Sequence, residues 1–171
     1  MTSPLDNGNR WPALGVALFF LGCGGSLLVS ERPALALINE SPSVPRGVYV
    51  RVVGAAPVRG DTVALAQPPG SRVYLGGLGM PGEVRLLKRV AGSASDEACR
   101  IGDRLQVGGR TVTVLRTDRR GVNLPQWSGC RRLEAGEVFL LGDTPGSFDS
   151  RYFGPVRVTD LDGVFREILT W

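Results

Sequence analysis

At residues 39–49 the chain reads Asn39-Glu40-Ser41-Pro42-Ser43-Val44-Pro45-Arg46-Gly47-Val48-Tyr49. Two serines alternate with two prolines here, after an apolar run ends and before a β-branched run begins. Proline fixes its own φ and disfavours the helical region for the residue before it. We therefore expect Ser41 and Ser43 to lie extended in a stiff loop that presents their hydroxyls and backbone N–H groups. A polar turn leading into a strand is the alternative interpretation.

The basic residues are unusual in kind. The 171 residues include no histidine, which excludes Ser-His-Asp triads, Cys-His dyads and histidine metal sites. Among the 20 Lys and Arg residues only Lys88 is a lysine. A GC-rich coding bias explains the use of arginine in place of lysine elsewhere in the chain. Lys88 then marks a position where arginine could not serve, because an ammonium can lose its proton on desolvation whereas a guanidinium effectively cannot. The net charge of +4 is spread along the chain, so we expect no nucleic-acid partner.

Residues 11–30 form an uncharged segment of 20 residues. As a helix this segment is about 30 Å long, the thickness of a bilayer core. The sequence thus predicts one transmembrane anchor at 11–31 after a short tail at 1–10. Two alternatives stay open: a signal peptide cleaved at the small-x-small site Ala34-Leu35-Ala36, and a degenerate lipid-attachment box at residues 20–23. The flanking charges, Arg10 and Arg32, do not decide the orientation.

Short β-branched runs separated by Gly and Pro follow the serine loop and predict strands. The runs cover residues 47–53, 61–66, 83–90, 137–141 and 163–169, with a hairpin at 104–114 whose tip is Gly108-Gly109. The pattern contains no long amphipathic helix. We therefore expect residues 38–171 to form one all-β domain built on a coiled or barrel-like sheet.

Lys88 lies within one of these predicted strands. Strand alternation places Leu86, Lys88 and Val90 on one face, so burial of the leucine would bury the lysine as well. Desolvation lowers a lysine pKa, whereas an unshifted amine is neutral in only about one molecule in 2,500 at pH 7. A neutral amine can take the proton of a serine hydroxyl, which is otherwise a weak nucleophile. A surface lysine is the alternative.

Two of the three cysteines, Cys99 and Cys130, flank the predicted hairpin and the return from it. If this domain lies outside the cytoplasm, we expect them to form a disulfide, which would contribute roughly 3–4 kcal/mol in the chain-entropy model. Two buried free thiols are the alternative. A metal site is not expected, since the sequence offers no other soft ligand nearby.

Three groups of residues together resemble the signature boxes of the type I signal peptidase family. The boxes are Ser41-x-Ser43-Val44-Pro45 with Gly47-Val48-Tyr49, then Leu87-Lys88-Arg89-Val90, then Gly142-Asp143 with Ser147-x-Asp149-Ser150-Arg151-Tyr152-Phe153-Gly154. Within the family the chain most resembles conjugative-transfer peptidases. The features that carry this closer resemblance are Asn39, the single apolar span and residues 125–133. The third box is one residue shorter than the housekeeping form, although its Gly142-Asp143 and Asp149-Ser150-Arg151 look more like that form.

The resemblance implies roles for individual residues. Ser43 would be the nucleophile and Lys88 the general base. Ser41 would offer its hydroxyl to the oxyanion hole beside the Ser43 backbone N–H. Ser147 would hydrogen-bond the Lys88 amine and orient it.

Further residues would support this site. Asp143 with Arg89, and Asp149 with Arg151, would be structural ion pairs, because a carboxylate near an amine raises its pKa. The side chains implied to line shallow apolar pockets for small substrate residues are Val44, Leu86 and Leu87. No metal or cofactor is implied.

The sequence as a whole predicts a membrane-anchored serine endopeptidase that cleaves exported precursor proteins after small residues. The expected substrate is a conjugative pilin precursor, and secretory preproteins cleaved by a housekeeping enzyme are the alternative. We expect a single-pass protein of the bacterial inner membrane, in contact with lipid, with the catalytic domain on the periplasmic face. A self-cleaving repressor-type protease and a non-catalytic envelope protein are less consistent with the apolar span and with the presence of both Ser43 and Lys88.

Overall fold

The structure is a computed structural model that describes residues 33–171, which form one compact unit. The predicted tail at 1–10 and the predicted anchor at 11–31 lie outside the described residues. Within residues 33–171, no helix combines the length and apolar character needed to cross a membrane.

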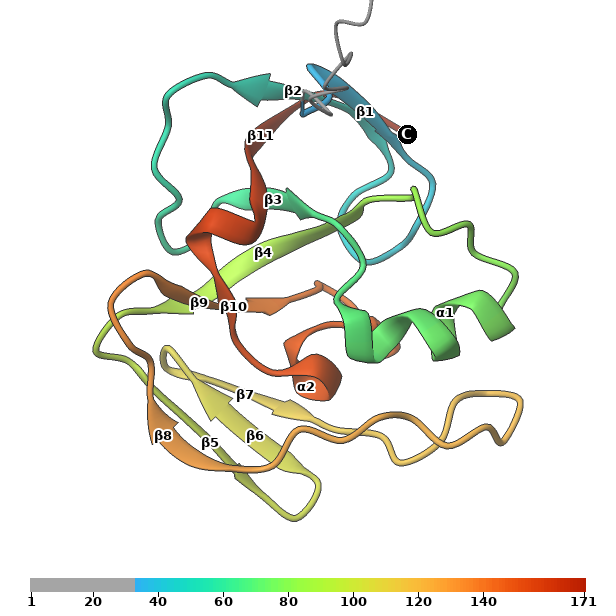
Figure 1. The fold of residues 1–171 in the computed structure, drawn as a ribbon, viewed down its shortest axis with the longest axis vertical. Helices are drawn as coiled ribbons and strands as arrows, with labels where there is room; N and C mark the ends of the chain where they lie inside the picture. Colours follow the sequence, from blue (N-terminus) through green and yellow to red (C-terminus); the bar gives the residue numbers. More distant parts are fainter. Residues whose placement is uncertain (1–32) are drawn as a thin grey trace, which may run out of the picture. The chain divides into compact units, whose positions relative to one another are not determined.

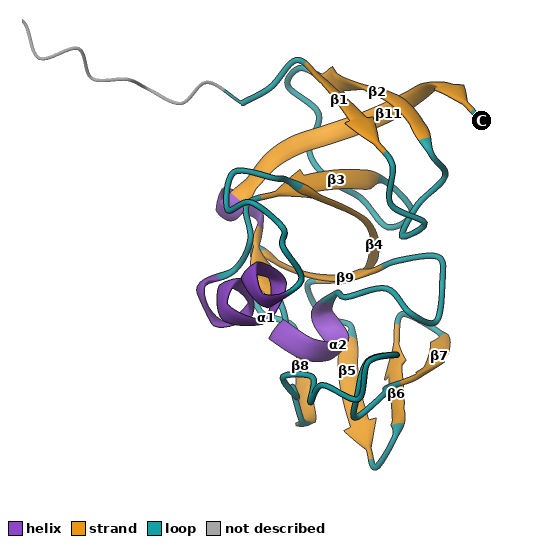
Figure 2. Cartoon of the chain, turned by 90° about the vertical axis from the view of Figure 1, so that its right-hand side faces the viewer, coloured by secondary structure: helices purple, strands orange, loops and turns teal. Residues whose placement is uncertain are grey.

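A seven-stranded antiparallel sheet forms the larger part of the unit (Figure 1). Its strands, in spatial order, are β1 (Ala36–Asn39), β2 (Gly47–Val52), β11 (Leu161–Thr170), β3 (Thr62–Leu65), β4 (Leu86–Ser93), β9 (Glu137–Leu141) and β10 (Val156–Arg157). Seen from the side, the strands follow one another around a curve (Figure 2). Register shifts in the pairings of β11 with β2 and β3, and of β4 with β9, accompany this curvature, as β-bulges bend and twist a sheet.

The central strands are buried on both faces. β3 is buried at every position, and its residues pair with those of β4 so that Val63 lies opposite Lys88 and Ala64 opposite Leu87. Leu86 and Val90 pack in one apolar cluster, whereas Leu87 packs in another with Val44, Tyr49, Ala64 and Phe165. The predicted alternation of faces along this strand is therefore present, and Lys88 lies on the Leu86 face.

A second, four-stranded antiparallel sheet lies at the opposite end of the unit (Figure 1). Its strands, in order, are β7 (Arg110–Thr113), β6 (Arg104–Val107), β5 (Glu97–Ile101) and β8 (Gly129–Arg132). Gly108 and Gly109 both have positive φ at the predicted hairpin tip, which is the conformation that a two-residue hairpin turn needs. A disulfide joins Cys99 of β5 to Cys130 of β8, which lie opposite each other in the register.

The helical segments of the described chain are short. They are η1 (Pro69–Ser71), α1 (Arg72–Gly77), α2 (Ser150–Phe153) and η2 (Val158–Asp160). Asp149 caps α2 by accepting a hydrogen bond from the Arg151 backbone N–H. Leu75 of α1 is buried in the same cluster as Leu86, so this helix packs against the Lys88 face of the sheet.

The prediction of an all-β domain is confirmed for the described residues, and the transmembrane helix in the same prediction lies outside them. Strands β2, β3 and β9 lie within one residue of their predicted bounds. The strand predicted at 83–90 is shifted, because Pro81-Gly82 opens a turn and pairing with β9 extends β4 to Ser93. Strands β1, β5, β8 and β10 and helix α1 were not predicted.

Candidate active site

The serine loop connects β1 to β2 and is organised by the Asn39 side chain. Asn39 Nδ2 donates to the carbonyls of Ser41 at 2.8 Å, Val44 at 3.0 Å and Pro45 at 3.0 Å, while its Oδ1 accepts from the Ser41 N–H at 3.1 Å. The Tyr49 hydroxyl also donates to the Pro45 carbonyl, at 2.7 Å. These bonds fold Pro42 and Ser43 into a turn. The expectation of an extended Ser43 is wrong, because one buried amide gathers three carbonyls of the loop.

The Ser43 hydroxyl lies at the centre of a small hydrogen-bond network. Its Oγ accepts from Ser41 Oγ at 2.9 Å and from Ser147 Oγ at 3.2 Å. The Ser43 backbone N–H donates to Ser41 Oγ at 3.2 Å. Two hydroxyls thus donate to the Ser43 oxygen, which leaves its own hydrogen for a third acceptor.

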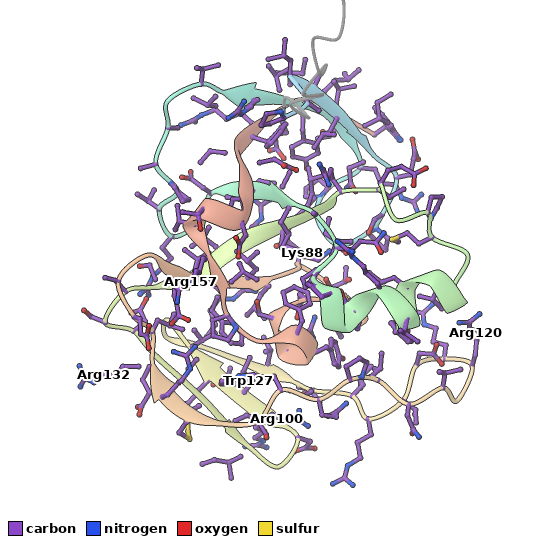
Figure 3. The ribbon with its side chains drawn as sticks, viewed as in Figure 1. Lys88, Arg100, Arg120, Trp127, Arg132 and Arg157 are labelled. Carbon is purple, nitrogen blue, oxygen red and sulfur yellow. A yellow bond between two sulfur atoms is a disulfide. The ribbon has the colours of Figure 1, made fainter. Side chains whose placement is uncertain are left out.

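Lys88 projects from β4 into the interior, whereas Arg120 and Arg132 lie at the edges of the view (Figure 3). Its side chain is almost inaccessible, with 3% relative exposure. Burial lowers the Lys88 pKa from 10.5 to about 8. The charge of Arg151 lowers this pKa further, whereas the charges of Asp149 and Asp143 raise it. Among the residues that the structure describes, the Lys88 amine forms no hydrogen bond.

Ser147 reaches the nucleophile candidate from the loop between β9 and α2. Its hydroxyl donates to Ser43 Oγ, whereas the resemblance implied a hydrogen bond to the Lys88 amine. This approach requires a glycine at 142, since a β-carbon there would overlap the Ser147 side chain and come within 2.9 Å of the Ser43 carbonyl oxygen. The Asp143 N–H donates to that same carbonyl at 2.6 Å. The two loops that carry Ser43 and Ser147 are therefore in direct contact.

A buried ion pair holds the Ser147 loop in place. Arg151 Nη2 lies 2.7 Å from Asp149 Oδ2, and both side chains are at most 2% exposed. The remaining guanidinium N–H groups donate to the backbone carbonyls of Thr113, Thr144, Pro145 and Ser147 at 2.9–3.2 Å. Asp149 also accepts from the Gly142 N–H at 2.8 Å. Arginine suits this position because its planar fork offers five fixed donors.

The second predicted ion pair, Arg89 with Asp143, is also present and is half-exposed. Arg89 Nε lies 3.0 Å from both carboxylate oxygens of Asp143, and Arg89 Nη1 donates to Thr62 Oγ1 at 3.2 Å. Each carboxylate near Lys88 is therefore paired with an arginine. This pairing limits how far Asp143 and Asp149 raise the Lys88 pKa.

A cavity of about 430 Å³ brings these residues together. Its lining includes Ser41, Ser43, Leu86, Leu87, Lys88 and Ser147, together with residues of α1 and of the Ser147 loop. Val44 is placed differently from the prediction, because it is 1% exposed and packs in the core against Leu87 and not on the cavity wall. The cavity thus contains a serine hydroxyl and a desolvated amine, which are a nucleophile and a base suited to acyl transfer, beside an apolar wall.

Three contributors to the site have roles that the sequence indicates only in part. The resemblance includes Asn39 and Gly142 without giving their contacts, and for Arg151 it implies the ion pair with Asp149 but not the hydrogen bonds to four backbone carbonyls. Asn39 and Arg151 act by donating hydrogen bonds to backbone carbonyls of nearby loops. Gly142 acts by allowing two loops to pack closely. Such contacts leave no periodicity or spacing to detect.

Comparison with known proteins places the chain in a family. A family model described as "Signal peptidase, peptidase S26" matches residues 11–171. The chain is 31% identical to a plasmid transfer protein TraF of Escherichia coli, with 92% of each chain covered. It is 33% identical to the conjugal transfer protein TraF of Agrobacterium tumefaciens (strain 15955), with 91% of this chain and 96% of that protein covered.

A solved signal peptidase I from Enterococcus faecalis V583 aligns with 64% of this chain and 97% of that one, at 26% identity and a TM-score of 0.38. The resemblance read from the three boxes is confirmed by the family model and by the TraF relatives. The chain belongs to the signal peptidase family, peptidase S26.

Proposed function

We propose that this chain is a serine endopeptidase in which Ser43 is the nucleophile and Lys88 the general base. Family membership implies peptidase activity on precursor proteins. One observation carries the mechanistic proposal: the only lysine of the chain is buried, has a pKa lowered to about 8, and lines the same cavity as Ser43. The free enzyme has no bond between them, and such bonds often form only once substrate is bound.

Acylation follows from these positions. Neutral Lys88 takes the Ser43 proton while Ser43 Oγ attacks the scissile carbonyl carbon. The oxygen of that carbonyl becomes an oxyanion, for which the Ser43 N–H and the Ser41 hydroxyl are the nearest donors. The Ser43 N–H and Ser41 Oγ now bond to each other at 3.2 Å, so the oxyanion takes over donors that are already positioned. The Lys88 ammonium then protonates the leaving amine, and the acyl-enzyme remains.

Deacylation uses the same two residues. A water molecule attacks the acyl-enzyme carbonyl as Lys88, neutral again, removes its proton. The collapsing intermediate releases Ser43 Oγ, which takes back the proton from the ammonium. Ser147 keeps the Ser43 oxygen in place through both steps, because the one hydroxyl hydrogen of Ser41 turns from the Ser43 oxygen to the oxyanion.

A lysine can act as a base only when its amine is neutral, and the lowered pKa of Lys88 greatly increases the neutral fraction at pH 7. At pH 7 a pKa of about 8 leaves roughly one amine in ten neutral, against about one in 3,000 for an unshifted pKa of 10.5. This gain corresponds to roughly 3 kcal/mol of catalytic barrier.

The apolar cavity wall supports a preference for small residues before the scissile bond. Leu86 and Leu87 both line the cavity that contains Lys88, and we propose that they contact the small side chains. We further propose a conjugative pilin precursor as the substrate, on the likeness to two proteins named for plasmid and conjugal transfer. Removal of signal peptides from secretory preproteins is the alternative, and cleavage of each precursor by the purified chain discriminates between them.

We also propose that the domain works on the periplasmic face of the bacterial inner membrane. The predicted anchor at 11–31 ends just before β1. Exposed apolar side chains gather across β1, β2 and β11: Ile38, on the same face and in register with Val48 and Leu169, and the neighbouring Ile168 and Trp171. The disulfide supports an oxidising compartment.

The decisive experiment compares Ser43→Ala and Lys88→Arg with Ser128→Ala, an exposed serine outside the cavity. We expect the first two variants to lose cleavage of a precursor while thermal unfolding shows an intact fold, and the third to keep it. Full activity of Lys88→Arg would overturn the dyad, since arginine cannot act as the base. The wild-type rate should rise with pH through about 8, and a flat profile from pH 6 to 9 would contradict Lys88 as base.

A further inference from the structure

A second cavity, of about 670 Å³, adjoins the active-site cavity. The two share part of their lining, namely Pro42, Leu78, Thr144, Gly146 and Phe148. Pro42 is next to Ser43 in the chain and Gly146 is next to Ser147. The two cavities therefore meet at residues adjacent in the chain to Ser43 and Ser147.

The floor of the second cavity is preformed and aromatic. The Phe148 ring stacks between Tyr74 and Tyr152, with centroid distances of 4.9 and 5.2 Å. The same tyrosines hold the opposite wall, because the Tyr74 hydroxyl donates to Asp118 at 3.2 Å and the Tyr152 hydroxyl accepts from the Leu115 N–H at 3.3 Å. These contacts hold the aromatic floor and the opposite wall together in the absence of a ligand.

The rim of this cavity is basic. It is formed by the segment Leu115–Leu124 between β7 and β8, where Figure 3 shows Arg120 at the outer edge beyond α1. Asp118 is already engaged by the N–H groups of Arg120 and Val122 and by the Arg120 guanidinium at 3.5 Å. Arg119 is exposed and forms no ion pair within residues 33–171. Its charge remains available to an acidic group on a ligand.

We propose that the second cavity binds the substrate segment that follows the scissile bond, taking an apolar side chain on its aromatic floor and an acidic side chain at Arg119. This inference rests on the proposed function. An endopeptidase substrate continues on both sides of the bond, and the Leu86–Leu87 wall is assigned to the residues before it. The substrate polypeptide that continues from the scissile bond at Ser43, past Pro42 and the 144–146 loop, enters the second cavity.

The inference is tested with the purified full chain in detergent and three quenched peptides. All three share the residues before the bond, ending in Ala-Leu-Ala. The first ends one residue after the bond, the second continues with alternating Leu and Glu, and the third continues with alternating Leu and Lys. The variants are Arg119→Glu, Leu115→Trp, which fills the cavity, and Arg110→Glu, a matched charge reversal on β7 outside both cavities.

For each enzyme, kcat/KM of each long peptide is divided by kcat/KM of the short peptide. We expect this ratio to be roughly 5- to 10-fold higher for the acidic peptide than for the basic one in both wild type and Arg110→Glu. Arg119→Glu should reverse that preference, and Leu115→Trp should lower cleavage of both long peptides relative to the short one. An unchanged ranking of the three peptides in both variants would overturn the inference while the proposed function stands. Failure of wild type to cleave any of the three peptides would overturn the proposed function itself.

Discussion

The two sheets differ in how they are held together and in what they contribute to the cavities. The seven-stranded sheet has central strands buried on both faces, and the strand β4 and the loops of this sheet carry Ser43, Lys88 and Ser147. The four-stranded sheet is mostly exposed, and its strand β8 is exposed at every position. Its interior side packs on the larger sheet, and a disulfide closes its outer edge.

This difference separates two tasks. Acyl transfer needs groups held within a fraction of an ångström, which dense packing supplies. The connection between β7 and β8 needs only to offer a wall and a charge to a passing polypeptide, and it lies within the loop that the disulfide closes. We infer that the chemistry depends on the first sheet, and that the second sheet contributes to the choice of the residues after the scissile bond.

Outside the proposed dyad, the largest effect on activity should come from crowding the contact between the Ser43 and Ser147 loops. In Gly142→Ala the new methyl group overlaps Ser147 and presses on the Ser43 carbonyl. We expect kcat/KM to fall at least about 1,000-fold, or about 4 kcal/mol, because both hydroxyls are displaced. Gly70→Ala, where a β-carbon meets nothing within 4 Å, is the matched control. Retained activity in Gly142→Ala would show that the site tolerates movement of these loops.

Removal of the disulfide should affect stability and leave the chemistry intact. The double variant Cys99→Ser, Cys130→Ser opens a loop with a sequence separation of 31. We expect the free energy of unfolding in urea to fall by roughly 3–4 kcal/mol, with kcat/KM for a peptide ending one residue after the bond within about twofold of wild type. A large loss on that short peptide would contradict the separation of tasks between the sheets.

Replacement of Lys88 should stabilise the fold while it abolishes activity. The folded-state pKa of about 8 is below the ordinary lysine pKa of 10.5, so the unfolded chain binds more protons between these pH values and stability rises with pH across that window. Below about pH 8 the full cost of burying the ammonium is present. Lys88→Met should therefore raise the free energy of unfolding by roughly 3 kcal/mol at pH 7 and by much less above pH 10.5.

Chemical unfolding at the two pH values measures this effect. Arg104→Met, an exposed cation on β6, is the control and should change stability by less than about 0.5 kcal/mol. Destabilisation by Lys88→Met at pH 7 would show that the amine makes stabilising contacts in the fold.

Local pattern was sufficient to predict much of the fold. The alternation in β4 correctly assigned Lys88 and Leu87 to opposite faces, and the Gly108-Gly109 pair correctly located a hairpin tip. Strand β8 was missed because Gly129-Cys130-Arg131-Arg132 is polar and exposed. It is a strand through its pairing with β5, and Arg131 is further fixed by Glu137 at 2.7 Å.

The composition of the site was more predictable than its geometry. Motif residues indicated Ser43, Lys88 and Ser147, which the structure brings to one cavity. The turn at Pro42-Ser43 was not predictable, because the Asn39 amide and not the prolines sets it. Nor was the contact of Ser147 with Ser43, since it depends on how closely the loop at Gly142 approaches the loop at Ser43.

The smallest effect tests whether paired carboxylates tune Lys88. Asp143 raises the Lys88 pKa, so Asp143→Asn should move the midpoint of the pH–rate profile to lower pH. The shift should be less than about half a pH unit, because Arg89 already balances this half-exposed carboxylate. Arg89→Ala should move the midpoint in the opposite direction, since it leaves the carboxylate uncompensated. Glu97→Gln on the four-stranded sheet should not move it. Shifts of the same sign in Asp143→Asn and Arg89→Ala would mean that loop displacement, not charge, controls the amine.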